Sequence, residues 1–191
     1  MMRIITGRAR GIKLNTLEGE NTRPTSERAK EAVFSMLQFD IEGRRVLDIF
    51  AGSGQMGLEA VSRGAASATM VDSSKDAVAV IKRNVEKTKL SDSCRVLCAK
   101  AEDFIRTMKG RESYDIVFID PPYALRLVAP TLAALLDAKM IKSTSIIVCE
   151  SEEPDVFEKM PELATKFDVL KTAKYGVAHV TVLKLKEEAQ Q

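Results

Sequence analysis

From residue 44 onward the chain alternates between short apolar runs, typical of buried strands, and amphipathic stretches, typical of helices. The five strand-like runs, which four helical patterns separate, are RRVLDIFA, SATMVD, CRVLCAK, YDIVFID and SIIVCES. Strands joined by crossover helices lie parallel, and strands that are apolar throughout are buried on both faces. The sequence therefore predicts a Rossmann-like α/β fold in which helices cover both faces of a mostly parallel sheet.

Both ends of the chain depart from this alternation. After Glu150, two strand-like runs meet at Gly176, which predicts a closing antiparallel hairpin and brings the sheet to seven strands. Before residue 44, RIITGRARGIKL predicts a β-hairpin and TSERAKEAVFSML predicts an amphipathic helix. A segment of 43 residues is too short for a core of its own. We therefore expect residues 1–43 to be an extension that packs on a main domain of residues 44–191.

Composition excludes several classes of protein. With 191 residues and 45% hydrophobic residues, the chain has the size and the apolar content of one globular domain. It contains neither a signal-peptide pattern nor an apolar run of the roughly 18 residues that a membrane helix needs, so we expect a cytoplasmic protein. Cys94, Cys98, Cys149 and His179 are too scattered for a disulfide framework or a metal site, and we expect structural roles for them. The oligomeric state stays open.

Positive charge gathers near the start of the chain. Residues 1–30 contain seven basic side chains against three acidic ones, and no acid precedes Thr16. A solvated hairpin and a surface that contacts phosphates would both produce this pattern. Arg8, Arg10 and Lys13 are the candidates for such a contact.

The clearest cofactor motif is VLDIFAGSGQMGLEA, in which a strand runs into a glycine-rich turn and then into a helix. Gly52, Gly54 and Gly57 form GxGxxG, and Asp72 ends the next strand at the place where an acidic residue binds ribose hydroxyls. Taken alone, the motif fits a dinucleotide or S-adenosylmethionine (SAM). Asp48 favours SAM, because a carboxylate beside the turn repels a pyrophosphate and attracts a sulfonium. Asp48 could instead serve only as a hydrogen-bond acceptor for the turn.

A second motif, Asp120-Pro121-Pro122-Tyr123, follows the fourth strand. Ligands of open α/β sheets bind outside the carboxyl ends of the strands. The two prolines remove backbone donors, which leaves the Asp120 carboxylate and the Pro121 carbonyl as acceptors suited to the two N–H groups of a base amine. The Tyr123 ring offers a face on which an extruded base can stack. We expect these four residues to be the catalytic set.

The adenosine end of the pocket is predicted to lie between the second and third strands. Small polar and acidic residues follow both strands there, and Glu102 or Asp103 is the candidate for contact with adenine unless both are simply first-turn acids of a helix. The predicted cofactor-binding residues of these loops are Asp48, Phe50, Ala51, Gly52, Gly54, Asp72, Ser73, Ala101 and Glu102.

Together, D-x-F-x-G-x-G and DPPY resemble the motifs of class I SAM-dependent methyltransferases that modify exocyclic amines. The opening segments IITGRARGIKL and RPTSERAKEAVFSML further resemble the bacterial RsmD family, and the likeness runs from Arg3 to about Leu185. This resemblance implies a class I methyltransferase fold and transfer of methyl from SAM to the N2 amine of a guanine in 16S rRNA, free or in a small-subunit assembly particle. It also implies that Arg23 and Thr25 bind the cofactor and that Arg8 and Arg10 face RNA.

The residues alone leave other functions open. An adenine-N6 methyltransferase acting on RNA or DNA would use the same DPPY chemistry, because the acceptors select an amine and not a particular base. A nicotinamide oxidoreductase is disfavoured by Asp48 and DPPY, and a non-catalytic RNA-binding protein would need both motifs to be vestigial. If RNA is the substrate, residues 124–129 are expected to close over the base, with Arg126 as a phosphate contact.

Overall fold

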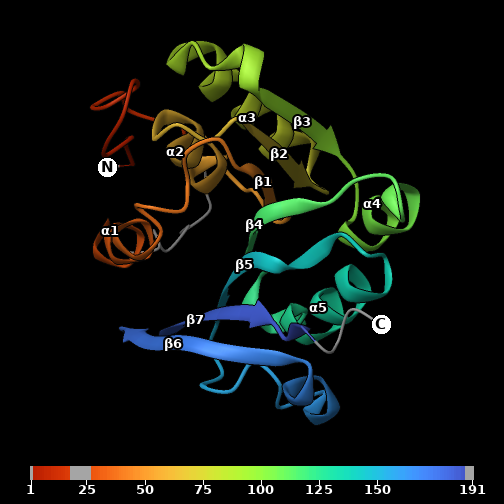
Figure 1. Ribbon diagram of the computed structural model, residues 1–191. Coiled ribbons are helices and arrows are strands. Elements are labelled where there is room, and N and C mark those ends of the chain that lie inside the picture. The colour runs from red at the N-terminus through yellow and green to blue at the C-terminus, as the bar shows by residue number, and fades with distance from the viewer. Residues whose placement is uncertain (1, 18–26, 188–191) are drawn as a thin grey trace.

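The computed structural model describes residues 2–17 and 27–187. These residues form a seven-stranded sheet with the strand order β3-β2-β1-β4-β5-β7-β6 (Figure 1). The strands are β1 (Arg45–Asp48), β2 (Ser67–Asp72), β3 (Cys94–Cys98), β4 (Tyr114–Ile119), β5 (Ile141–Ser151), β6 (Phe167–Tyr175) and β7 (Ala178–Leu185). β1 to β5 pair in parallel, whereas β7 is antiparallel to both β5 and β6. The predicted parallel sheet with a closing antiparallel hairpin is confirmed.

Helices cover both faces of this sheet (Figure 1). They are α1 (Glu27–Met36), α2 (Gln55–Ser62), α3 (Lys75–Thr88), α4 (Ala101–Met108) and α5 (Val128–Asp137). One core joins α1, α2, α3 and the N-terminal segment to the sheet, and the other core joins α4 and α5 to its opposite face. Successive side chains of β4 point to opposite faces, so this strand contributes to both cores. Ile116 and Phe118 lie in the first core, and Val117 and Ile119 lie in the second. None of the helices in the described part of the chain is long and apolar enough to span a membrane.

Two predicted elements differ from the structure. Because proline favours the first position of a helix, the run PTLAALLDAKMI predicts a helix that opens at Pro130, but α5 begins two residues earlier, at Val128. Pro130 is tolerated in the first turn because the N–H groups of that turn have no intrahelical partner. The N-terminal hairpin is reduced to the single bridge between Arg3 and Lys13. Its strands do not extend further because the backbone N–H groups of residues 5, 6, 8 and 9 bond to α2 instead of across the hairpin.

Candidate functional site

The loop after β1 has the conformation that its glycines predict. Gly52 and Gly54 have φ angles of 54° and 78°, in the left-handed region that glycine adopts readily, and Gly54 directly precedes α2. Residues 51–54 are called the glycine loop below. The Ala51 N–H donates to the Val71 carbonyl of β2, so the loop stays attached to the sheet while it turns. The motif thus forms a tight turn at the carboxyl edge of the sheet, and the N–H groups of Ala51, Gly52 and Gly54 are bonded within the protein.

Asp72, at the end of β2, ties two loops together. Its Oδ2 accepts the Gly52 N–H at 2.8 Å, and its Oδ1 accepts the Ser74 N–H at 2.8 Å. The carboxylate predicted to bind the cofactor ribose therefore lies directly against the glycine loop. Because a carboxylate has about four acceptor positions, these two bonds are compatible with further contacts to ribose hydroxyls.

Asp48 lies beneath the glycine loop and is only 2% exposed. It accepts the Gly57 N–H at 3.1 Å, so its alternative role as a hydrogen-bond acceptor is realised in the structure. Burial raises the pKa of Asp48 to about 7, the Gly57 hydrogen bond opposes this shift, and the negative charge of Asp72 adds to it. Its negative charge, and with it the expected attraction for a sulfonium, therefore depends on pH near neutrality.

A pocket of about 300 Å³ opens at the same edge of the sheet. It is lined by Phe50, Ser73, Lys100, Ala101, Glu102, Ile105, Pro122, Leu125, Leu127, Pro130, Thr131 and Ala134. Phe50, Ser73, Ala101 and Glu102 were predicted cofactor residues, and the fold brings them together from three loops. Asp103, the alternative adenine contact, instead pairs with Arg106 at 2.6 Å outside the pocket.

The far wall of this pocket was missed by the sequence analysis. Ile105 comes from α4, and Leu127, Thr131 and Ala134 come from the start of α5 or its first turns. The available signal was the apolar stripe of each helix, which cannot tell a side chain that packs on the sheet from one that faces a pocket.

The DPPY segment leaves β4 at the neighbouring strand end. Asp120 is half-buried, Pro121 is buried, and Tyr123 begins a short 3-10 turn, Tyr123–Leu125. The Tyr123 hydroxyl donates to Glu150 Oε1, in β5, at 2.6 Å. Pro122 lines the pocket, so the two predicted motifs meet at one site.

The predicted RNA contacts occupy two separate surfaces. Arg8, Arg10 and Lys13 are exposed on the N-terminal segment, where the Arg8 guanidinium donates to Ser93 Oγ at 3.3 Å. Arg126 is exposed after the 3-10 turn, and its guanidinium pairs with Glu153 at 2.9 Å, so a phosphate would have to replace that partner. Arg23 and Thr25 lie outside the described residues.

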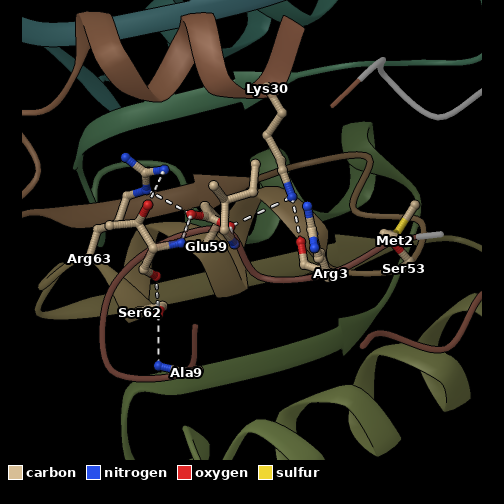
Figure 2. Close-up of polar contacts among 10 residues, drawn as sticks. Met2, Arg3, Ala9, Lys30, Ser53, Glu59, Ser62 and Arg63 are labelled. Atoms are coloured by element: carbon tan, nitrogen blue, oxygen red, sulfur yellow. Dashed lines mark hydrogen bonds and ion pairs between the residues drawn. The ribbon is translucent and has the colours of Figure 1, made fainter. Parts of the chain in front are cut away.

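A buried polar cluster that the sequence analysis did not single out is centred on Glu59 of α2 (Figure 2). Its carboxylate accepts the Ile5 and Thr6 N–H groups at 2.7 and 3.0 Å and the Arg63 Nε–H at 2.7 Å. Lys30 Nζ of α1 lies 3.6 Å from Glu59 Oε2 and donates to the Arg3 carbonyl at 2.7 Å. Lys30 and Glu59 are both fully buried. This cluster anchors α1 and the N-terminal segment on the helix that follows the glycine loop.

A second buried residue joins the N-terminal segment to the glycine loop itself. Asn84 of α3 donates through Nδ2 to the Ser53 carbonyl at 2.9 Å and to the Asn15 carbonyl at 3.0 Å. Its Oδ1 accepts the Asn15 N–H at 2.7 Å. The Ser53 hydroxyl also donates to the Met2 sulfur at 2.9 Å (Figure 2). The segment that carries Arg8 and Arg10 therefore shares its supports with the glycine loop.

This strand order, with β7 inserted antiparallel between β5 and β6, defines a class I methyltransferase fold; a dinucleotide-binding sheet has the order 3-2-1-4-5-6. The model of the family "Conserved hypothetical protein 95" matches residues 2–184. The chain belongs to this family, the RsmD family.

Relatives of known name and solved structures agree with this assignment. "Ribosomal RNA small subunit methyltransferase D" of Haemophilus influenzae is 35% identical over 153 residues, which cover 80% of this chain and 79% of the relative. The Escherichia coli K12 protein of the same name is 35% identical over 160 residues, with coverages of 84% and 79%. The solved structure of E. coli yhhF has a TM-score of 0.82 and 32% identity, and the match covers 97% of this chain and 98% of that one.

Proposed function

We propose that this protein transfers a methyl group from SAM to the exocyclic N2 amine of a guanine in 16S rRNA. The observation that carries the proposal is that Phe50, directly before the glycine loop, and Pro122 of the DPPY segment line one pocket, within a family whose relatives are named as small-subunit rRNA methyltransferases. RNA as the substrate also accounts for the exposed basic side chains of the N-terminal segment.

The residues present fit SAM as the cofactor. The pocket has apolar walls suited to a flat adenine ring, with the Glu102 carboxylate on its rim, and Asp72 lies against the loop where a ribose would bind. Asp48 is a buried acid of raised pKa, and a nearby cation would stabilise its ionised form. SAM, when bound, supplies an electrophilic methyl group on a positively charged sulfur.

The chain's own residues would then orient the amine. The lone pair of a guanine amine is delocalised into the ring, so it is a poor nucleophile. Acceptance of the two N–H groups by the Asp120 carboxylate and the Pro121 carbonyl would localise that lone pair and direct it toward the methyl carbon. Asp120 also accepts the released proton, and Tyr123 stacks against the base after it has left its helix or loop.

The direct test is incubation of the protein with labelled SAM and unmodified small-subunit rRNA or assembly particles. Nucleoside analysis and mapping of the product identify the base, the atom and the position together. Label in N2-methylguanosine at one position of 16S rRNA supports the proposal. Label in N6-methyladenosine would establish the adenine alternative, and the absence of any transfer to RNA would contradict methylation of rRNA.

Cofactor affinity should depend on pH through Asp48. Because the pKa of Asp48 is about 7 and a sulfonium prefers the ionised carboxylate, SAM affinity should fall by up to about tenfold per pH unit as the pH decreases below 7. Calorimetric titration between pH 5.5 and 8.5 measures this dependence. S-adenosylhomocysteine, whose sulfur is neutral, provides the matched control and should show a weaker dependence. An Asp48→Asn variant that keeps the full pH dependence would contradict the assignment.

Reversal of two charges on the N-terminal segment should weaken RNA binding. The double variant Arg8→Glu/Arg10→Glu should lose about tenfold in RNA affinity and reduce the slope of log affinity against log salt by about one to two units. SAM affinity should not change. The matched control reverses Lys171 and Lys174, two exposed cations of β6 at the far edge of the sheet. Equal RNA affinities of the two double variants would remove the N-terminal segment from the interface.

A further inference from the structure

Glu150 in β5 is a hydrogen-bond partner of Tyr123, the last residue of the DPPY segment. The Tyr123 hydroxyl donates to Glu150 Oε1 at 2.6 Å, and both side chains are half-buried. A hydrogen bond from a hydroxyl to a carboxylate at this distance is charge-assisted and holds both groups in place. The position of the Tyr123 ring therefore depends on a residue of the next strand.

The strand register brings Glu150 beside Asp120. Ile119 of β4 pairs with Cys149 of β5. The residue after Ile119 is Asp120, and the residue after Cys149 is Glu150. Neighbouring strands lie about 4.8 Å apart. Ile119 and Cys149 both contribute to the core under α4 and α5, so by alternation the two acids lie toward the opposite face, which carries α1, α2 and the N-terminal segment. Two carboxyl groups thus arise at adjacent strand ends on the same face of the sheet.

This arrangement matches the hydrogen-bonding edge of guanine. Guanine presents two neighbouring kinds of donor on its Watson–Crick edge, the N1–H and the N2 amine, whereas adenine presents its amine next to an N1 acceptor. We propose that Glu150 is a specificity-determining residue that accepts the N1–H of a guanine whose N2 amine is held by Asp120. A carboxylate has about four acceptor positions, so the bond from Tyr123 is compatible with this role.

The same carboxylate would reject adenine. The Glu150 carboxylate would face the N1 lone pair of adenine. Both groups are acceptors, so no hydrogen bond forms between them and they repel each other. This inference rests on the proposed function and assigns the choice between guanine and adenine to Glu150, because the amine acceptors of DPPY do not distinguish the two bases.

The test compares guanine with 2-aminopurine at the mapped target position of an rRNA substrate. 2-Aminopurine keeps the amine at C2 but has an acceptor at N1. The wild-type protein should methylate guanine much faster, and Glu150→Ala should reduce the ratio of the two single-turnover rates by about 10- to 100-fold. Glu150→Gln should also lower the ratio, because its amide can donate to N1 of 2-aminopurine. Glu152→Gln, an exposed acid two residues further on, is the control and should leave the ratio unchanged.

The outcomes separate this inference from the proposed function. A wild-type protein that methylates no guanine overturns the proposed function before any Glu150 variant is considered. Guanine methylation by the wild type, with an unchanged rate ratio in Glu150→Ala and Glu150→Gln, overturns the inference alone and leaves Glu150 as a support for Tyr123. Binding of S-adenosylhomocysteine reports whether each variant is folded, and the nearly isosteric Glu150→Gln decides the question if the alanine variant is not.

Discussion

Replacement of Asp120 by alanine should lower the single-turnover rate of RNA methylation by at least about 1000-fold while SAM affinity stays within about twofold. The side chain follows β4 directly and is half-buried, two residues before Pro122 of the pocket wall, and it would hold the amine and accept its proton. The loss combines two effects, since the amine is no longer aligned with the methyl carbon and no carboxylate accepts the released proton. Rapid-quench methylation with saturating cofactor measures the chemical step directly.

Two further variants control this experiment. Asp120→Asn keeps the size of the side chain and one acceptor oxygen, so it should retain more activity than the alanine variant and show whether alignment or proton acceptance contributes more. Asp137→Asn removes an exposed acid of α5 that pairs with Lys109, and this variant should leave the rate unchanged. An alanine variant at position 120 with a normal single-turnover rate would show that the amine is oriented by other groups.

Replacement of Glu59 by alanine should lower the free energy of unfolding by about 3–5 kcal/mol, the cost of removing one partner of a buried ion pair. The Lys30 ammonium would stay fully buried and lose the Glu59 carboxylate, and the Ile5 and Thr6 N–H groups would lose their acceptor. Urea unfolding followed by circular dichroism measures the change. Asp103→Ala, which breaks the exposed pair with Arg106, should cost less than about 1 kcal/mol.

A double variant distinguishes the ion pair from simple loss of packing. Lys30→Met/Glu59→Leu removes both charges and keeps comparable side-chain volumes, so it should be more stable than the single variant Glu59→Leu, which has the same packing at position 59 but keeps the buried ammonium. If the double variant is as unstable as the single one, the backbone donors of residues 5 and 6, and not the buried ammonium, account for the loss.

The Glu59 cluster and Asn84 also bear on how the two proposed ligands could affect each other. Asn84 contacts both Asn15 and the Ser53 carbonyl of the glycine loop, and Glu59 lies in the helix that starts at that loop. A displacement of the N-terminal segment therefore changes contacts of the loop that we propose to face the cofactor. Charge reversal at Arg8 and Arg10 leaves these supports in place, because both side chains are exposed.

Local signals in the sequence are sufficient to predict most of the fold. The run SATMVD coincides with β2, and the two C-terminal runs coincide closely with β6 and β7, because alternation and apolar content are properties of neighbouring residues. The left-handed conformations of Gly52 and Gly54 follow equally from the motif. The N-terminal hairpin was less predictable, since its backbone found better acceptors on α2, more than fifty residues away.

The same distinction holds for the candidate site, where some features follow from the local sequence and others only from the tertiary structure. The order of strands and helices, the turn made by the glycine loop and the chemical character of DPPY can all be derived from the printed residues, because each depends on local backbone preference or on side-chain type. The raised pKa of Asp48, the pairing of Arg126 with Glu153 and the place of Glu150 beside Tyr123 depend on which distant segments pack together. Burial and charge proximity are properties of the assembled chain, so these features emerge only when the sheet and its two helical layers are in place.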